Sequence, residues 1–195
     1  GYDAVRDFAP VSLITRFYNA LSVHPSVPAK SVRDLIALAK ARPGALVVPS
    51  AGAGSTSHLA AELFQSMTGT KVLHVPYKGG GQMVIAVISG EGQVMFSPVS
   101  TAVPHGKTGK LRLLGVSSAA RIASLPDVPA IAETIKGYEY GGWQGLLAPA
   151  GTPAEVINRL HAGVLKVIAT PEFRDYAAGE GSDIVGSTPD WFAQF

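Results

Sequence analysis

The sequence contains no cysteine among its 195 residues. A disulfide framework, a thiolate nucleophile and a cysteine-ligated metal are therefore excluded. Charge is also scarce, because only 15% of the residues are charged and the formal net charge is +2. The lysines and arginines are scattered along the chain, so neither nucleic acid nor an anionic membrane surface is an expected partner.

Long apolar runs are missing as well, since no stretch of about 18 apolar residues occurs. We therefore expect a chain that is not itself embedded in a membrane. Hydrophobic residues nevertheless make up 47% of the sequence, which is typical of a globular protein with a core. The chain begins with Gly1, and only a few residues follow the helix-start signal at 187–190. We expect a fragment of a longer protein.

A run of small residues separates an apolar strand pattern from an apolar helix pattern. The strand pattern covers 45–48, the small residues cover 49–57, and the helix pattern begins near Leu59. The first N–H groups of a helix have no acceptor within the helix, and the helix dipole adds positive potential there. The pattern therefore predicts an anion site. The simpler alternative is a tight turn that needs glycine and serine for its own geometry.

Strand and helix patterns alternate along residues 22–117. We predict strands at 45–49, 72–75, 93–96 and 111–116, with helices at about 31–41, 57–68, 80–89 and 100–105. This order predicts a mostly parallel sheet with helices on both faces. The loops 50–57, 76–80 and 97–100 should then meet at the carboxyl edge of the sheet, where such folds bind ligands.

The remaining residues, 1–21 and 118–195, have a different character. They contain an extended apolar segment and several helix signals, but not enough strands for a sheet of their own. We therefore predict two lobes. One is a complete α/β lobe over 22–117, and the other is an incomplete lobe made from 1–21 and 118–195.

The motifs of catalysis and metal binding are incomplete. The segment 106–108 lacks the glycine at 101 that a phosphate-binding loop requires, and the histidines have no metal-ligand spacing. Ser55 or Ser57 beside His58 does not form a nucleophile–base pair, because adjacent residues at a helix start point in different directions. We predict no catalytic residue, metal or cofactor. An enzyme acting on a carboxylic acid or ester, with His58 as base, is the alternative.

Two further loops are candidates for the same anion site. Lys78 adds a cation to a glycine-rich helix start, and Ser97 and Ser100 follow the strand at 93–96. The simpler alternatives are a solvated lysine on a turn and two serines that cap the next helix.

Six motifs occur in order along the whole chain. They are Tyr2-Asp3-x-Val5-x-Asp7-Phe8, Val23-His24-Pro25-x-x-Pro28-Ala29-Lys30-Ser31, Ala51-Gly52-x-Gly54-Ser55-x-Ser57-His58-Leu59, His74-Val75-Pro76-Tyr77-Lys78-Gly79, Ser124-Leu125-Pro126-Asp127-Val128-Pro129 and Gly145-Leu146-Leu147-Ala148-Pro149-Ala150-Gly151-Thr152-Pro153. In this order they resemble the Bug family, the extracytoplasmic receptors of tripartite tricarboxylate transporters.

The resemblance implies an α/β fold with two lobes, like that of type II periplasmic binding proteins, truncated at the N-terminus and at the C-terminus. It implies a periplasmic solute-binding protein, not an enzyme, that captures a small mono- or dicarboxylate and delivers it to membrane transporter subunits. By resemblance, the ligand-binding residues are Gly54, Ser55, Thr56, Ser57, His58, Lys78 and Ser97.

Two departures from the family pattern bear on these expectations. Many members carry an acidic residue where Ser97 stands here, so specificity for amino acids is less expected. The family also begins upstream of Gly1, with a loop that supplies the other half of the cleft. A sheet edge left exposed without that segment could pair with a second copy, so a dimer of the truncated chain is a third hypothesis.

Overall fold

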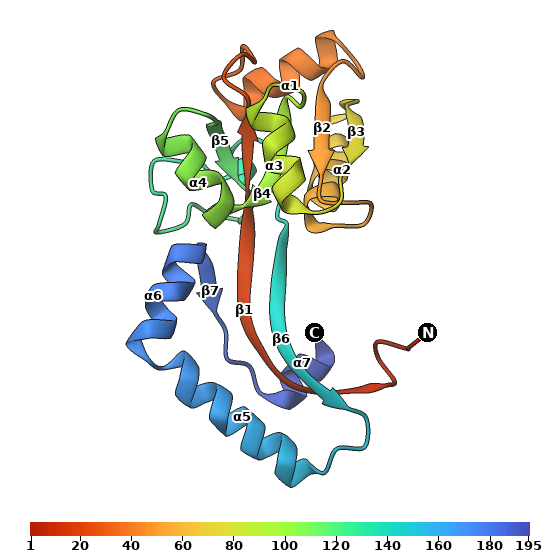
Figure 1. Cartoon of the computed structure of the whole chain (residues 1–195), viewed down its shortest axis with the longest axis vertical. Helices are drawn as coiled ribbons and strands as arrows, with labels where there is room; N and C mark the ends of the chain where they lie inside the picture. Colours follow the sequence, from red (N-terminus) through yellow and green to blue (C-terminus); the bar gives the residue numbers. More distant parts are fainter. The chain divides into compact units, whose positions relative to one another are not determined.

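The longest strand of the chain, β1 (Phe8–Val23), contributes to both of the units that the structure forms. A computed structural model describes all of residues 1–195, and Figure 1 shows the order of its elements. Unit 1 consists of Gly1–Phe17 and Gly142–Phe195, whereas unit 2 consists of Tyr18–Gly141. None of the helices combines the length and the apolar character that crossing a membrane requires.

Strands and helices alternate along unit 2, as the sequence patterns predict. Its strands after β1 are β2 (Val47–Ser50), β3 (Leu73–Pro76), β4 (Val94–Pro98) and β5 (Arg112–Val116). Its helices are α1 (Val32–Ala41), α2 (Thr56–Thr68), α3 (Gly80–Ile88), α4 (Val99–Lys107) and the short 3-10 helix η1 (Ile131–Glu133). Serine explains two of the helix starts, because the hydroxyls of Ser31 and Ser55 cap α1 and α2.

The second half of β1 lies between β4 and β5 and runs antiparallel to both. Ala20 lies opposite Ser97 on β4 and opposite Val116 on β5. β2 and β3 form a separate parallel pair. The predicted mostly parallel sheet is therefore right for β2 and β3 and wrong for the strand between β4 and β5. Alternation of strands and helices does not reveal that an N-terminal strand enters the sheet.

The core of unit 2 occupies both faces of this sheet, because neighbouring side chains of a strand point to opposite faces. On one face, Leu21 and Phe96 pack with residues of α1 and α2. On the other face, Ala20 packs with residues of α4, and Met95 packs with residues of α3. α3 and α4 therefore cover the same face, and both lie in front of β1 in Figure 1.

Residues 118–141 complete the core of unit 2. Ile131, Ile135 and Tyr138 are buried in it, and the Tyr138 hydroxyl donates to the backbone oxygen of Ala60 at 2.9 Å. Burial also raises the pKa of Tyr138. The sequence analysis assigns this segment to the incomplete lobe, whereas its packing groups it with unit 2. The division into lobes 22–117 and 1–21 with 118–195 stays a prediction for the complete protein.

Unit 1 combines the first half of β1 with the C-terminal elements. These are β6 (Gly141–Pro149), α5 (Ala154–Ile168), α6 (Pro171–Glu180), β7 (Ser182–Ile184) and α7 (Pro189–Gln194). β6 and β7 both pair with β1. The hydroxyls of Thr170 and Thr188 cap α6 and α7, and a proline follows each cap. Proline suits the first helical position, because its fixed φ is helical and its missing N–H has no acceptor there.

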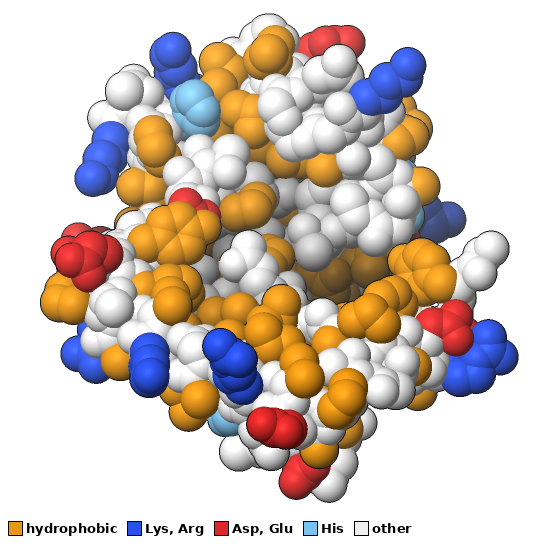
Figure 2. Space-filling model, turned by 60° about the horizontal axis from the view of Figure 1, so that its bottom comes forward, with side chains coloured by type: hydrophobic (Ala, Val, Ile, Leu, Met, Phe, Trp, Pro, Cys, Tyr) orange, Lys and Arg blue, Asp and Glu red, His pale blue; other side chains and the backbone are white.

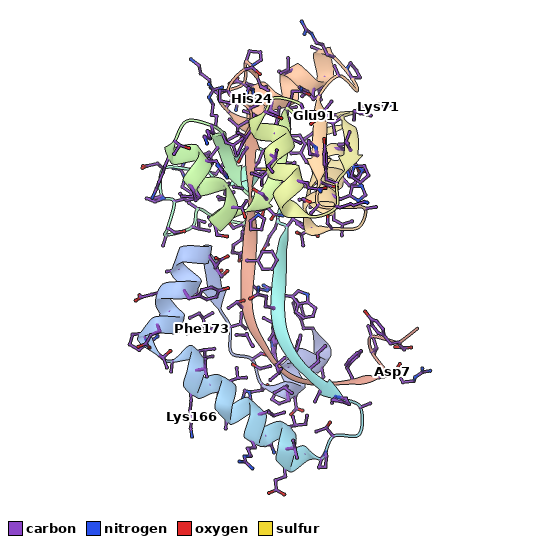
Figure 3. The ribbon with its side chains drawn as sticks, viewed as in Figure 1. Asp7, His24, Lys71, Glu91, Lys166 and Phe173 are labelled. Carbon is purple, nitrogen blue, oxygen red and sulfur yellow. The ribbon has the colours of Figure 1, made fainter.

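Apolar side chains of unit 1 remain exposed. α5 has no buried residue. Its Lys166 side chain points away from the strands of this unit (Figure 3). Its exposed apolar residues include Val156, Leu160 and Leu165. Hydrophobic side chains gather on the face that Figure 2 brings forward. Residues 1–195 therefore do not supply a complete core for unit 1.

Candidate anion-binding site

The N-terminus of α2 lies at the end of a short loop that follows β2. Gly52 and Gly54 have φ values of +128° and +78°, a region that favours glycine. The hydroxyl of Ser55 accepts from the backbone N–H of His58 at 3.4 Å. Helix geometry leaves the N–H groups of Thr56 and Ser57, the first two residues of α2, without an acceptor in the helix. An anion at this point meets two donors and the positive end of the helix dipole.

The serine hydroxyls of the loop form hydrogen bonds within the loop. The Ser57 hydroxyl oxygen accepts from the backbone N–H of Ala51 at 2.9 Å and lies 2.9 Å from the Ser55 hydroxyl oxygen. The Ser55 hydroxyl also donates to the backbone oxygen of Gly52 at 2.7 Å. These bonds hold the loop in shape. The hydroxyls therefore position the backbone N–H groups, which are the free donors of the loop.

A pair of stacked histidines supports the same loop. The rings of His58 and His74 lie 4.0 Å apart and nearly parallel. Nδ1 of His58 accepts from the backbone N–H of Gly54 at 3.0 Å, so this nitrogen carries no proton. Nε2 of His74 is 2.6 Å from the Ser50 hydroxyl oxygen. Burial lowers the pKa of His74, and the neighbouring His58 lowers it further. The lowered pKa favours the neutral form of the His74 ring.

His58 is poorly placed for the role of a catalytic base. Its Nδ1 is occupied by Gly54, and its Nε2 lies 3.7 Å from a carboxylate oxygen of Glu62, one helical turn further on. Its ring stacks on His74 and does not line the pocket beside the α2 N-terminus. The geometry assigns His58 to the support of the loop.

A pocket of about 580 Å³ lies beside the α2 N-terminus. Thr56 and Ser57 line it from the first loop, Gly80 from the second loop and Pro98 from the third. The predicted meeting of these three loops is therefore present in the structure. The pocket continues between α3 and α4.

Lys78 and Ser97 do not line this pocket. Lys78 is exposed, and its backbone N–H donates to the side-chain oxygen of Gln82 at 3.2 Å. Ser97 is completely buried, and its hydroxyl has no hydrogen-bond partner. The structure therefore gathers the predicted residues 54–58 in one loop and leaves the two other predicted residues apart from it.

Asn19 is a polar residue of this region that the sequence analysis did not select. Its side chain is buried, with Nδ2 at 3.5 Å from the backbone oxygen of Thr56. Its Oδ1 has no hydrogen-bond partner. A buried, unpaired acceptor is costly unless something binds it. The sequence feature that could have indicated this residue is an asparagine within the apolar strand pattern at 11–23, because asparagine is depleted in strands.

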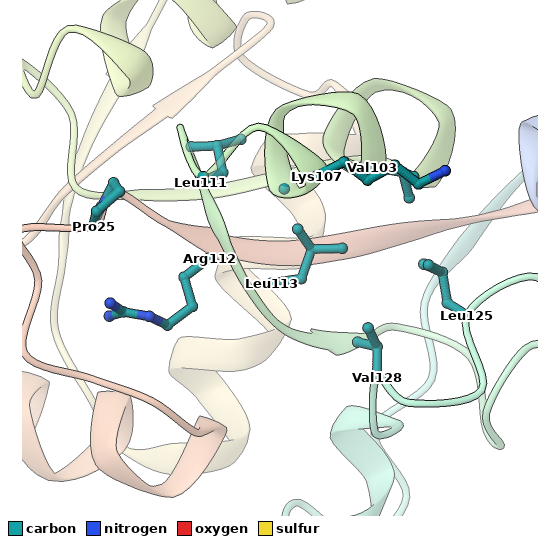
Figure 4. A pocket seen from close by; sticks show the side chains of 10 residues that line it. Pro25, Val103, Lys107, Leu111, Arg112, Leu113, Leu125 and Val128 are labelled. Atoms are coloured by element: carbon teal, nitrogen blue, oxygen red, sulfur yellow. The ribbon is translucent and has the colours of Figure 1, made fainter.

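A second pocket of about 470 Å³ lies on the other side of α4, and Figure 4 shows its lining. Val103, Leu113 and Val128 give it apolar walls, and Arg112 lies at its edge. The Arg112 guanidinium donates to two backbone oxygens, at 3.1 and 3.0 Å. The Arg112 guanidinium is therefore already engaged, and Lys107 is the other cation of the lining.

Residues 1–195 match the model of the tripartite tricarboxylate transporter family receptors over their whole length, and the chain belongs to this family. A curated relative is BugT of Bordetella pertussis, which is 32% identical over 192 residues. That match covers 97% of this chain and 58% of BugT. The chain thus spans about three fifths of the length of such relatives.

Solved structures show the same fold. Rpa4515 of R. palustris, solved with adipate, has a TM-score of 0.92 and 35% identity, covering 100% of this chain and 65% of that one. MatC of Rhodopseudomonas palustris, solved with bound malate, has a TM-score of 0.88 and 27% identity, covering 100% and 67%. The predicted α/β fold of periplasmic binding proteins and the assignment to the Bug family are confirmed. The family consists of solute-binding receptors, not enzymes.

Proposed function

We propose that this chain forms part of an extracytoplasmic receptor that captures a small mono- or dicarboxylate and delivers it to the membrane subunits of a tripartite tricarboxylate transporter. The observation that carries the proposal is the open N-terminus of α2, where Thr56 and Ser57 present backbone N–H groups beside a pocket. The adipate-bound and malate-bound relatives support a carboxylate as the ligand. The family of the chain supports a periplasmic location.

The chemistry of the loop fits recognition of a carboxylate. Two neighbouring N–H groups match the two oxygens of a carboxylate, and the helix dipole stabilises its negative charge. The rigid network among Ser50, Ser55, Ser57 and the two histidines fixes the donors before the ligand arrives. A preformed site loses little conformational entropy on binding, which favours affinity.

The predicted site residues take different roles in this proposal. Gly54, Ser55 and His58 shape the loop, whereas Thr56 and Ser57 contact the carboxylate through their N–H groups. Lys78 and Ser97 do not line the pocket and have no direct contact with the carboxylate in this proposal. Asn19 is a further residue of the proposed site. Its Nδ2 is near the backbone oxygen of Thr56, the first residue of α2, and its Oδ1 has no hydrogen-bond partner.

Replacing Thr56 by proline tests the role of the backbone donor. Thr56 is the first residue of α2, and Ser55 before it has φ −67° and ψ 162°, a conformation that a following proline allows. The protein itself starts α6 and α7 with proline. Thr56→Pro should therefore fold normally while removing one N–H donor. Thr56→Ala removes the hydroxyl but keeps the N–H, and is the matched control.

Isothermal titration of the full-length protein with a panel of carboxylates measures the outcome. Loss of one hydrogen bond to a charged ligand costs about 1.5–3 kcal/mol. Thr56→Pro should weaken binding about tenfold to a hundredfold, whereas Thr56→Ala should change it much less. Equal affinity of Thr56→Pro and the wild type would place the carboxylate elsewhere. Failure of every carboxylate to bind, with an amine or a sugar binding tightly, would disprove the proposed function.

A further inference from the structure

The pocket beside the α2 N-terminus changes character along its length. Near the loops it is lined by Thr56, Ser57 and glycine backbone, which are polar. Further in, between α3 and α4, its lining includes the apolar side chains of Met83, Val84 and Ile88. A ligand that fills this pocket therefore meets polar donors at the loop end and, further in, an apolar wall of α3 that lies opposite α4.

No lysine or arginine lines this pocket. The polar side chains that α4 contributes are Thr101 and His105. A second carboxylate against the apolar wall of α3 would lose part of its hydration without gaining a lysine or arginine partner, and this loss is unfavourable. A volume of about 580 Å³ lies within the usual range for pockets that hold a small organic molecule.

The apolar part of the pocket is anchored in the core of unit 2. Met83 and Val84 are buried and pack with Met95 of β4. Ser97 lies on the same face of β4 as Met95, because side chains two residues apart share a face. Its unpaired, completely buried hydroxyl is therefore on the side of the sheet that α3 and α4 cover. The part of the wall formed by Met83 and Val84 is thus fixed by the core.

We infer that the groove between α3 and α4 is a subsite for the apolar body of the ligand, so that the receptor prefers an aliphatic or aromatic monocarboxylate to a dicarboxylate of the same length. The inference rests on the proposed function, because it needs a carboxylate at the α2 N-terminus. It narrows the ligand class from mono- or dicarboxylates to carboxylates with one charged end. It also separates this receptor from the relatives solved with adipate and malate.

Hexanoate and adipate form the sharpest pair of probes, because they have the same number of carbons and differ in one terminal carboxylate. In titrations of the full-length protein, hexanoate should bind at least about tenfold more tightly than adipate. Along the series acetate, butyrate and hexanoate, affinity should rise by about fourfold for each methylene that enters the groove. Adipate binding as tightly as hexanoate, or a flat series, would overturn the inference.

A variant that fills the groove provides the structural control. Gly81 lines the pocket on α3, and a Cβ built there meets nothing within 4 Å. Gly81→Leu should weaken hexanoate about tenfold or more and leave the melting temperature near that of the wild type. Ser66→Leu adds the same side chain at an exposed position of α2 that does not line the pocket, and should leave hexanoate affinity unchanged.

The two proposals fail in different ways. Unchanged hexanoate affinity in Gly81→Leu would contradict the proposal that the groove between α3 and α4 binds the ligand body. If Thr56→Pro still weakens carboxylate binding in that case, the proposed function stands and the ligand body lies outside the groove. If hexanoate, adipate and the rest of the panel all fail to bind, both the proposed function and the proposed subsite between α3 and α4 are wrong.

Discussion

The two units of the molecule differ in how completely they bury their apolar residues. In unit 2, large side chains such as Phe96, Tyr138 and Leu35 are almost entirely inaccessible to solvent. In unit 1, α5 has no buried residue, and Trp191 and Phe195 are about half exposed. Residues 18–141 therefore contain an extensive core, whereas 1–17 and 142–195 bury only a few apolar side chains, such as Leu13 and Phe192. The relatives of this family are longer than the chain, and the candidate site lies in the unit that is complete.

The largest difference between the units should appear on truncation of aromatic residues. Phe96 is 1% exposed and packs against Phe64, so Phe96→Ala should lower the free energy of unfolding by about 3–5 kcal/mol. Trp191 is 47% exposed, and Trp191→Ala should cost less than about 1 kcal/mol. Urea denaturation measures both values. Equal losses would show that unit 1 is buried as well as unit 2.

Alanine at glycine positions should destabilise one unit and stabilise the other. A Cβ at Gly92 would clash with the side chain of Pro49, so Gly92→Ala should cost about 1–3 kcal/mol through overpacking. Gly163 lies within α5, where a Cβ meets nothing within 4 Å. Gly163→Ala should stabilise the protein by up to about 1 kcal/mol, because alanine favours helix. Thermal unfolding measures both variants. A change in melting temperature of the same sign for Gly92→Ala and Gly163→Ala would contradict this comparison of the two units.

Exposed apolar residues of unit 1 should also drive association of the 195-residue chain. Leu160 is 41% exposed on α5, whereas Met67 is 39% exposed on α2 of unit 2. Leu160→Lys should reduce self-association, because it breaks an apolar surface, and Met67→Lys should have little effect. Size-exclusion chromatography with light scattering gives the molar mass of each variant. A chain that is monomeric before any substitution would contradict this expectation.

The smallest expected effect is a pH dependence that belongs to unit 2. Burial lowers the pKa of His74 below its ordinary value of 6.5, so the unfolded chain binds this proton more readily than the folded chain. The stability due to neutral His74 is therefore full above pH 6.5 and is lost as the pH falls toward the lowered value. His74→Gln should flatten this part of the stability–pH profile. Identical stability–pH profiles for the wild type and His74→Gln would show that His74 does not cause this pH dependence.

The sequence indicates the local parts of the site well. Small residues between a strand and a helix pattern predicted the loop at 50–57, and the apolar helix pattern predicted a helix from about 57, close to where α2 begins. Both depend on backbone chemistry within a few residues, which the local sequence reveals. The family assignment followed from motifs spread over the whole chain, and the comparisons confirm it.

Long-range features were less accessible. The insertion of β1 between β4 and β5 depends on pairing between residues that are far apart in the sequence, and an apolar strand pattern does not name its partner. The same limit explains why Asn19 was not selected, since only the folded sheet brings its amide to Thr56. Ser55 and Ser57 were expected among the ligand-binding residues, but the bonds of their hydroxyls to Gly52 and Ala51 appear only once the turn is formed.

The central claim is that the α2 N-terminus holds a carboxylate. Its most direct test is the amide NMR spectrum of the full-length protein during titration with the tightest-binding carboxylate of the panel. The account predicts that the N–H signals of Thr56 and Ser57 shift downfield more than those at the N-terminus of α1, where Val32 and Arg33 provide the reference. Unmoved signals of Thr56 and Ser57 at saturating carboxylate would contradict the claim.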